Sequence, residues 1–252
     1  MAWMLKTVCL VDACYKSPSP RARAARKIGG KSILEWVVRR TTDAQQVEGV
    51  VVVTTDDPEN QFLDRLVPPD VPILRAPTGD PLRALLVAAE RLSAEAAVRV
   101  RPLFPFLDSA LLDHLIIAAQ SLENPDYVTF CHRDGRPVLF SPLGLFAEWF
   151  RCDALRRAAR RFRGKQCFHE PTECILSRPH EFRVQMIPVP EEIDREDMRL
   201  VIGDEEDWDT TETIYEALGP ERLDWHAIVR LVNQCPQLRQ RMAALNQAQA
   251  AR

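Results

Sequence analysis

The segment from Arg99 to Asp108, RVRPLFPFLD, lies where an expected buried strand turns into the helix that follows it. In α/β proteins such strand ends often bind phosphate or a metal ion, and they then carry a glycine or an acidic residue. This turn carries apolar residues in their place: Pro102, Leu103, Phe104 and Pro105. The position is therefore suited to chemistry, whereas its side chains are not.

Three further segments match binding motifs only in part. The sequence GGKS at 29–32 has the end of a phosphate-binding P-loop, but Ala25 occupies the position of the motif's first glycine. The arginine-rich helix expected over 152–162 lacks the aromatic residues that stack nucleic-acid bases. The acidic run at 204–209 lacks the glycine and the distant glutamate of a calcium loop. We interpret these segments as a helix start and solvated surfaces.

The composition is that of an ordinary globular protein. Of the 252 residues, 46% are hydrophobic and 27% are charged, and the formal net charge of −3 argues against general nucleic-acid binding. The sequence has no apolar run of the roughly 20 residues that span a bilayer, and no basic leader precedes the apolar start. We therefore expect a cytoplasmic protein with no nucleic-acid or membrane partner. The seven scattered cysteines predict unpaired thiols.

Short β-branched runs alternate with helical patterns in the first half of the chain. Strands are expected at TVCLV, VEGVVVVTT, VPIL and AAVRV, and helices at 32–44, 79–92 and 108–122. Asp80 is the expected cap of the second helix, with Pro81 at its first position, and Asp108 or Ser109 opens the third. This alternation predicts an α/β fold with a mostly parallel sheet.

The second half follows a different rhythm. We expect strands at YVTF and PVLF around a turn at CHRDGR, a basic helix at 152–162, and a strand at RVQMIPV. A helix around WHAIVRLV precedes an Ala/Gln-rich tail that we expect to fray over 241–252. With no repeat and no linker, residues 1–240 are expected to form one domain.

Several segments, taken in order, resemble the acylneuraminate/ulosonate cytidylyltransferases, and most closely their spore coat polysaccharide biosynthesis branch. The resemblance covers about residues 6–240. The segments are KIGGKSILEWVVRR (27–40), VEGVVVVTTDDPEN (47–60), APTGDPLRALLVAAERLSAEAAVRVRPLFPFLD (76–108) and MRLVIGDEEDWDTTETIYEAL (198–218). It implies a three-layer Rossmann-like, glycosyltransferase-A-like nucleotidyltransferase fold. It also implies transfer of CMP from CTP to an acidic sugar with Mg²⁺, and a homodimer through the YVTF to PVLF region.

The resemblance also implies roles for individual residues. The triphosphate and its loop are assigned to Asp12, Lys16, Ser17, Arg21, Arg23 and Lys31. Asp56 is placed near the nucleoside, and the sugar side is assigned to Arg99, Asp108 and Glu148. Asp12, if it points toward a triphosphate, would repel it.

The sequence departs from the family pattern where the metal should be held. The two aspartates that hold magnesium are replaced by Leu103 and Gly203, so a metal would have to recruit Asp204 or Asp207. The glycines of the phosphate loop are also gone. The replacements suggest an apolar pocket, either open to another ligand or filled and closed, lined by Leu103, Phe104, Phe106 and Phe146.

Three functions remain open on these residues. The first is a cytidylyltransferase of surface-polysaccharide sugar activation, impaired or repurposed. The second is a non-catalytic relative that binds a nucleotide or sugar as a regulatory scaffold. The third, a glycosyltransferase that uses a nucleotide sugar, requires an Asp-x-Asp pair at a strand end, which we do not find directly after any expected strand.

Overall fold

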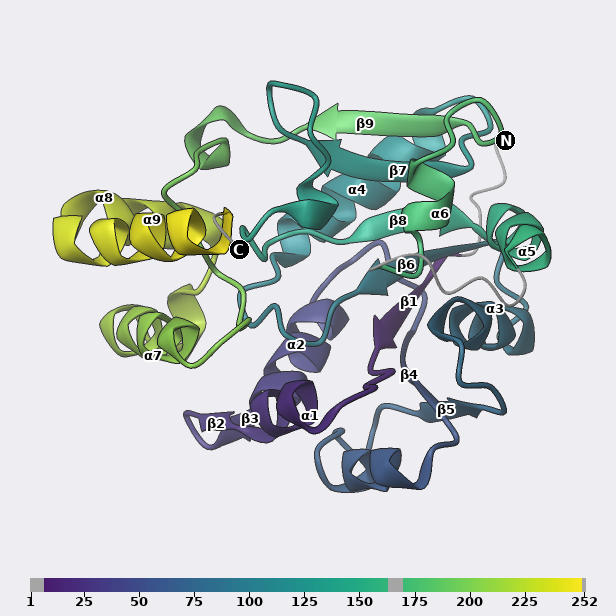
Figure 1. The fold of residues 1–252 in the computed structure, drawn as a ribbon, viewed down its shortest axis with the longest axis horizontal. Helices are drawn as coiled ribbons and strands as arrows, with labels where there is room; N and C mark the ends of the chain where they lie inside the picture. Colours follow the sequence, from purple (N-terminus) through teal and green to yellow (C-terminus); the bar gives the residue numbers. More distant parts are fainter. Residues whose placement is uncertain (1–6, 163–169, 251–252) are drawn as a thin grey trace.

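The computed structural model describes residues 7–162 and 170–250 and places a seven-stranded sheet at their centre (Figure 1). The strands are β1 (Thr7–Asp12), β4 (Val50–Thr55), β5 (Ile73–Ala76), β6 (Ala96–Val100), β7 (Tyr127–Cys131), β8 (Glu148–Arg151) and β9 (Val184–Pro188). Their order across the sheet is β5-β4-β1-β6-β8-β7-β9. Strand β8 runs antiparallel to its two neighbours, β6 and β7, and the other pairings are parallel. The mostly parallel sheet predicted from the sequence is confirmed.

Helices cover both faces of the sheet. They are α1 (Pro18–Ala25), α2 (Ile33–Thr42), α3 (Pro81–Arg91), α4 (Ser109–Ser121), α5 (Cys152–Arg161), α6 (Glu173–Leu176), α7 (Glu206–Leu218), α8 (Trp225–Gln234) and α9 (Pro236–Ala250). Alternate residues of β1 point to opposite faces. Val8 and Leu10 pack with α3 and α5, whereas Cys9 and Val11 pack with α2 and α4. Helices α7, α8 and α9 gather beyond one side of the sheet (Figure 1).

Local capping explains where the central helices begin. The Asp80 side chain accepts the Leu82 N–H at 3.0 Å, and Pro81 occupies the first helical position, as predicted. The Asp108 side chain accepts N–H groups of the first turn of α4. Ser32, after the short hairpin of β2 (Lys27–Ile28) and β3 (Lys31–Ser32), caps α2. GGKS therefore opens a helix, as its interpretation required.

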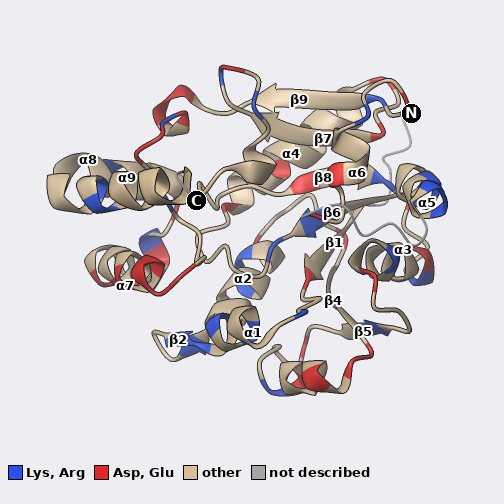
Figure 2. Cartoon of the chain, in the orientation of Figure 1, with Lys and Arg blue, Asp and Glu red and all other residues tan. Residues whose placement is uncertain are grey.

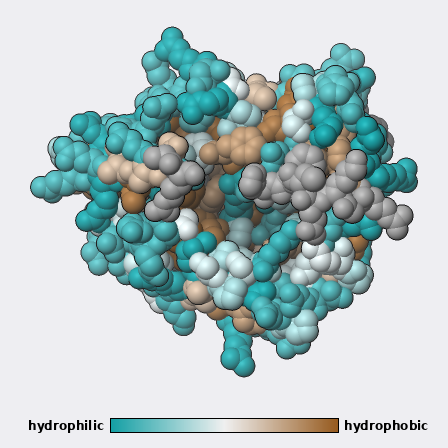
Figure 3. Space-filling model, in the orientation of Figure 1, coloured by the Kyte–Doolittle hydropathy of each residue, from teal (hydrophilic) through white to brown (hydrophobic). Residues whose placement is uncertain are grey.

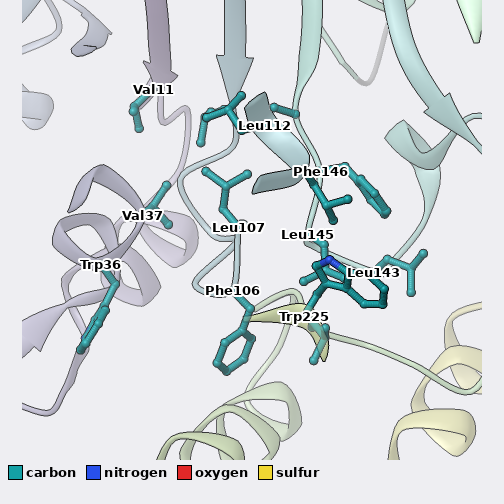
Figure 4. Packing of buried hydrophobic residues seen from close by; sticks show 14 of the residues in the cluster. Val11, Trp36, Val37, Phe106, Leu107, Leu112, Leu143, Leu145, Phe146 and Trp225 are labelled. Carbon is teal, nitrogen blue, oxygen red and sulfur yellow. The ribbon is translucent and has the colours of Figure 1, made fainter. Parts of the chain in front are cut away.

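Two residues predicted to line an apolar pocket, Phe106 and Phe146, lie in the hydrophobic core beside α2 and α4. Phe106 and Phe146 are almost fully buried in this cluster, with exposed fractions of 2% and 5%. The close-up in Figure 4 shows Phe106 above α7 and near Trp225, and Phe146 beside Leu145. Phe106 and Phe146 therefore belong to the core and not to the cavity lining, whereas Leu103 and Phe104 line the cavity. Phe104 and Phe106 diverge because the turn after β6 is irregular.

Two segments differ from the expected secondary structure. The Asp-Gly turn is present, with the Gly135 N–H donating to the His132 carbonyl at 2.9 Å. PVLF, however, forms a 3₁₀ turn at Val138–Phe140 with a single bridge between Cys131 and Pro137, because Pro137 has no N–H for a ladder. The tail expected to fray from 241 belongs to α9, where Met242 is fully buried and the Asn246 side chain donates to two carbonyls.

The remaining elements of the described chain are short. They are the 3₁₀ turns Pro58–Arg65, Glu191–Ile193 and Pro220–Arg222. Six cysteines lie in the described residues and all six are free thiols, while Cys167 lies outside them. Among the helices of residues 7–162 and 170–250, none combines the length and apolar character needed to cross a bilayer.

Candidate functional site

A cavity of about 1000 Å³ opens at the carboxyl ends of β1 and β6. It is lined by the loop after β1, the start of α3, the turn after β6, and residues 139–142, 170–171 and 201–203. The space-filling view shows a hollow in the middle of this face, with apolar surface gathered inside it (Figure 3). Of the sequence-predicted site residues, the cavity brings together five: Asp12, Lys16, Ser17, Arg23 and Arg99.

Arg99 is buried at the base of this cavity and binds three carboxylates. Its Nε donates to Asp12 at 2.7 Å, its Nη1 to Glu148 at 2.6 Å and its Nη2 to Glu170 at 2.8 Å. Basic and acidic segments of β1, β6 and β8 accordingly meet at the centre of the molecule in Figure 2. Burial would lower the pKa of Arg99, but the three carboxylates outweigh it and raise the pKa well above its usual value. The guanidinium therefore stays charged.

Glu148, one of the carboxylates around Arg99, has two further hydrogen-bond donors. Glu148 also accepts hydrogen bonds from the hydroxyls of Tyr127 and Thr172. Burial and the nearby Glu148 charge raise the pKa of Tyr127 well above its usual value, so the phenol keeps the proton that it donates. Glu148 lies against Arg99 beneath the cavity rather than among its lining residues. It is positioned to hold Arg99, and its contact with a sugar stays a prediction.

Asp12 is neutralised at the point where the sequence predicted repulsion. One oxygen accepts from Arg99 and the other from the Cys14 N–H at 3.3 Å. Asp12 is only 7% exposed. The Asp12 carboxylate therefore accepts hydrogen bonds from a loop amide and a buried cation, which could otherwise donate to an anionic ligand.

The loop after β1 offers cations rather than backbone amides. Ser17 precedes α1 without a side-chain cap, and two prolines, Pro18 and Pro20, remove N–H groups from its first turn. Lys16 is exposed at the cavity, and neither Lys16 nor Arg23 forms an ion pair with any residue in the described ranges. The Arg23 Nε is buried and lacks a hydrogen-bond partner there.

We tested whether the carboxylates present suit magnesium, which prefers several oxygen ligands. Leu103 and Gly203 both line the cavity and supply no side-chain oxygen. Asp207 is 1% exposed and is held by Arg199 and by the amides of Gly203 and Asp204. Within the described residues no group of three or more His, Cys, Asp or Glu side chains is arranged to hold a metal ion. The donor set does not fit the expected magnesium site.

Asp204 is the remaining candidate for a metal, and it is engaged in the same turn. Its Oδ1 accepts the Asp207 N–H at 3.2 Å, and its Oδ2 lies 3.6 Å from Arg199. Burial and the neighbouring Asp207 charge raise the pKa of Asp204. Asp204 and Asp207 both lie outside the residues that line the cavity.

Four other predicted residues also lie outside the cavity lining. Arg21 pairs with Glu59, and the Lys31 ammonium sits 4.8 Å from the centre of the Trp36 ring. Asp56 is exposed after β4. Asp108 caps α4 and accepts the Trp225 N–H at 3.0 Å, so it ties α4 to α8.

The structure adds four charged residues that the sequence did not assign to the site: Asp80, Arg83, Arg101 and Glu170. Arg83 lies in the first turn of α3, and its Nε is 3.9 Å from Asp80. The Nη2 of Arg101 lies 2.9 Å from Glu170, which bridges it to Arg99. A basic residue in the first turn of a helix at a strand end was the available signal for Arg83. For Glu170 the signal was its place in HEPTECILSRPHEF (169–182), a segment that resembles one of the family.

Comparison with known proteins identifies the family. The model of the MobA-like NTP transferase domain matches residues 20–171. The chain belongs to this family. A curated relative, the spore coat polysaccharide biosynthesis protein SpsF of Bacillus subtilis, is 24% identical over 235 residues, which cover 90% of this chain and 94% of that protein. The family and the SpsF relative agree with the resemblance seen in the sequence.

Solved structures of NTP transferases share the fold. A cytidylyltransferase from Leptospira borgpetersenii matches with a TM-score of 0.77 at 20% identity, covering 94% of this chain and 97% of that one. CMP:2-keto-3-deoxy-manno-octonic acid synthetase, solved with CTP, matches with a TM-score of 0.53 at 14% identity, covering 73% and 90%. The predicted Rossmann-like nucleotidyltransferase fold is confirmed.

Proposed function

We propose that this member of the MobA-like family binds a nucleotide, which we expect to be CTP, and that its magnesium-dependent cytidylyl transfer is impaired. One observation carries the proposal. The cavity measures about 1000 Å³ and is lined by several cations, while the positions that should hold the metal carry Leu103 and Gly203. The names of the relatives support CTP as the nucleotide and surface-polysaccharide sugar activation as the setting.

Nucleotide binding follows from the charges that face the cavity. Lys16, Arg23 and Arg83 lie on the side of the loop after β1 and the start of α3. Charge-assisted hydrogen bonds to phosphate are about twice as strong as neutral ones, and arginine can make them in pairs. The pairing of Asp12 with Arg99 reduces the repulsion between the Asp12 carboxylate and a phosphate chain bound by these cations.

Impaired transfer follows from the same geometry. Attack at the α-phosphorus builds up charge that must be neutralised where it develops. Leu103 supplies no metal ligand at the end of β6, and Asp12 and Glu170 direct oxygens to Arg99. The cations hold the ground state and the transition state alike, which binds the nucleotide without accelerating its reaction.

A pyrophosphate-release assay with CTP, magnesium and a panel of acidic sugars tests the loss of transfer. We expect no release above the protein-free background. Leu103→Asp is expected to make CTP affinity respond to magnesium, whereas its uncharged match, Leu103→Asn, is not. Steady turnover by the unmodified protein would refute the proposal.

Active transfer is the second candidate, because Lys16, Ser17 and Arg23 of the rewritten loop still line the cavity. It would require Asp204 to turn toward the cavity and bind the metal. Asp204→Ala should then abolish pyrophosphate release. The homodimer through 127–140 and the cytoplasmic location stay predictions, and analytical ultracentrifugation tests the first of them.

A further inference from the structure

One side of the cavity is apolar, and part of it is exposed to solvent. We call this side the apolar wall and define it as Leu103, Phe104, Leu139, Phe140, Pro142 and Val201. Phe140 is 56% exposed, although Phe104 and Leu139 behind it are buried. An exposed aromatic ring in a cavity, supported by buried apolar neighbours, is the usual composition of a surface that receives an apolar ligand group.

The wall and the cations that suit phosphate come from different segments of the cavity lining. Leu103 and Phe104 follow β6, and Phe140 ends the 3₁₀ turn at Val138–Phe140. Lys16 and Arg83 belong to other segments, the loop after β1 and the first turn of α3. A cavity of about 1000 Å³ is large enough for one ligand to touch both sides.

An acidic group against the wall would meet a cation that is already engaged. Arg101 is the cation beside it, with its guanidinium 5.2 Å from the centre of the Phe104 ring. Its Nη2 donates to the Leu139 carbonyl at 2.6 Å and lies 2.9 Å from Glu170. The positive charge of Arg101 is therefore already paired. A carboxylate placed against this wall would lose its water without gaining a counter-ion.

From this arrangement we infer that the cavity takes a nucleotide-linked group that is uncharged and apolar, such as a deoxy or acylated sugar, and not an acidic sugar. The inference rests on the proposed nucleotide binding and adds the class of the attached group. The phosphates lie on the cationic side, and the apolar substituent covers Phe140 and Leu103.

Three probes with the same phosphodiester charge test the inference by titration calorimetry: the methyl ester of cytidine 5′-monophosphate, called the free nucleotide below, and the phenyl and 4-carboxyphenyl esters. We expect the phenyl ester to bind roughly tenfold more tightly than the free nucleotide, which corresponds to burying about 60 Å² of apolar surface. The 4-carboxyphenyl ester is expected to lose that gain. Phe140→Ala should remove the gain of the phenyl ester and leave the affinity of the free nucleotide unchanged. The matched control is Met186→Ala, which truncates a 40% exposed side chain of β9 outside the cavity.

The outcomes separate the two proposals. If the phenyl ester binds no better than the free nucleotide, or the carboxylate strengthens binding, the inference fails and nucleotide binding stands. If Phe140→Ala weakens binding of the free nucleotide as much as binding of the phenyl ester, the base rather than the attached group covers the wall, and the inference again fails. If none of the three probes binds, the proposed function itself fails.

Discussion

Replacing Arg99 by leucine leaves the acidic base of the cavity without its common cation. In the native protein the guanidinium is 5% exposed and donates to Asp12, Glu148 and Glu170 at 2.6 to 2.8 Å. Leucine fills part of the volume and provides no donor. The carboxylates of Asp12 and Glu148, which are almost fully buried, then lack a counter-ion. The fold must either bury these charges unpaired or open locally to hydrate them.

The size of the effect follows from burial. Removing one partner of a buried ion pair costs about 3–5 kcal/mol, because the other charge stays in the interior. For a chain of this length, 1 kcal/mol shifts the Tm by about 2–4 °C, so we expect Arg99→Leu to lower the Tm by about 10 °C. Arg99→Lys keeps the charge but not the three-way contact, and an intermediate loss is expected.

Thermal unfolding followed by circular dichroism measures these shifts against an exposed ion pair. Arg39 donates to both oxygens of Asp70, but its side chain is 37% exposed and that of Asp70 is 59% exposed. Arg39→Leu is therefore expected to lower the Tm much less than Arg99→Leu does. If Arg99→Leu destabilises the protein no more than Arg39→Leu does, the cluster contributes little and our reasoning about it is wrong.

Three further predictions concern the scaffold. Gly144→Ala should destabilise the protein more than Gly135→Ala. Both glycines have positive φ, but a Cβ at 144 would lie 2.6 Å from a backbone oxygen, whereas a Cβ at 135 meets nothing within 4 Å. Urea denaturation of both variants tests this order. Asp108→Ala removes a helix cap and the acceptor for an amide of α8, and should cost about 2 kcal/mol in the same assay. The hydrogen bond from His132 lowers the pKa of Asp194, so the Asp194 carboxylate stabilises the fold above the usual carboxyl pKa, and this stabilisation is lost as the pH falls through the lowered pKa. The difference in free energy of unfolding between the native protein and Asp194→Asn should therefore shrink between about pH 6 and about pH 2.5. A difference that stays constant over this range would contradict the prediction.

Local features of the fold were predictable because neighbours in sequence determine them. Ser32, Asp80 and Asp108 cap helices through N–H groups two or three residues away, and the sequence shows both partners. The alternating strands and helices are also local, and they support the family resemblance. PVLF was mispredicted because its apolar residues fit a strand, whereas Pro137 withholds the ladder hydrogen bond.

The candidate site was predictable only in part, because its contacts join distant segments. The cluster around Arg99 spans 87 residues to Asp12 and 71 residues to Glu170, and no local pattern shows that these side chains meet. Phe104 and Phe106 are two residues apart in an irregular turn, so no period distinguishes the cavity residue from the core residue. The loss of the metal aspartates was visible in the sequence; the pairing of Asp207 with Arg199 was not.

Titration of CTP into the purified protein, in parallel with magnesium and with EDTA, tests the central claim most directly. We predict that CTP binds with the same affinity in both buffers and that Arg23→Gln weakens both titrations alike. CTP binding that appears only with magnesium would contradict the account, since a metal site would then exist despite Leu103 and Gly203. The absence of any CTP binding to the folded protein would contradict it as well.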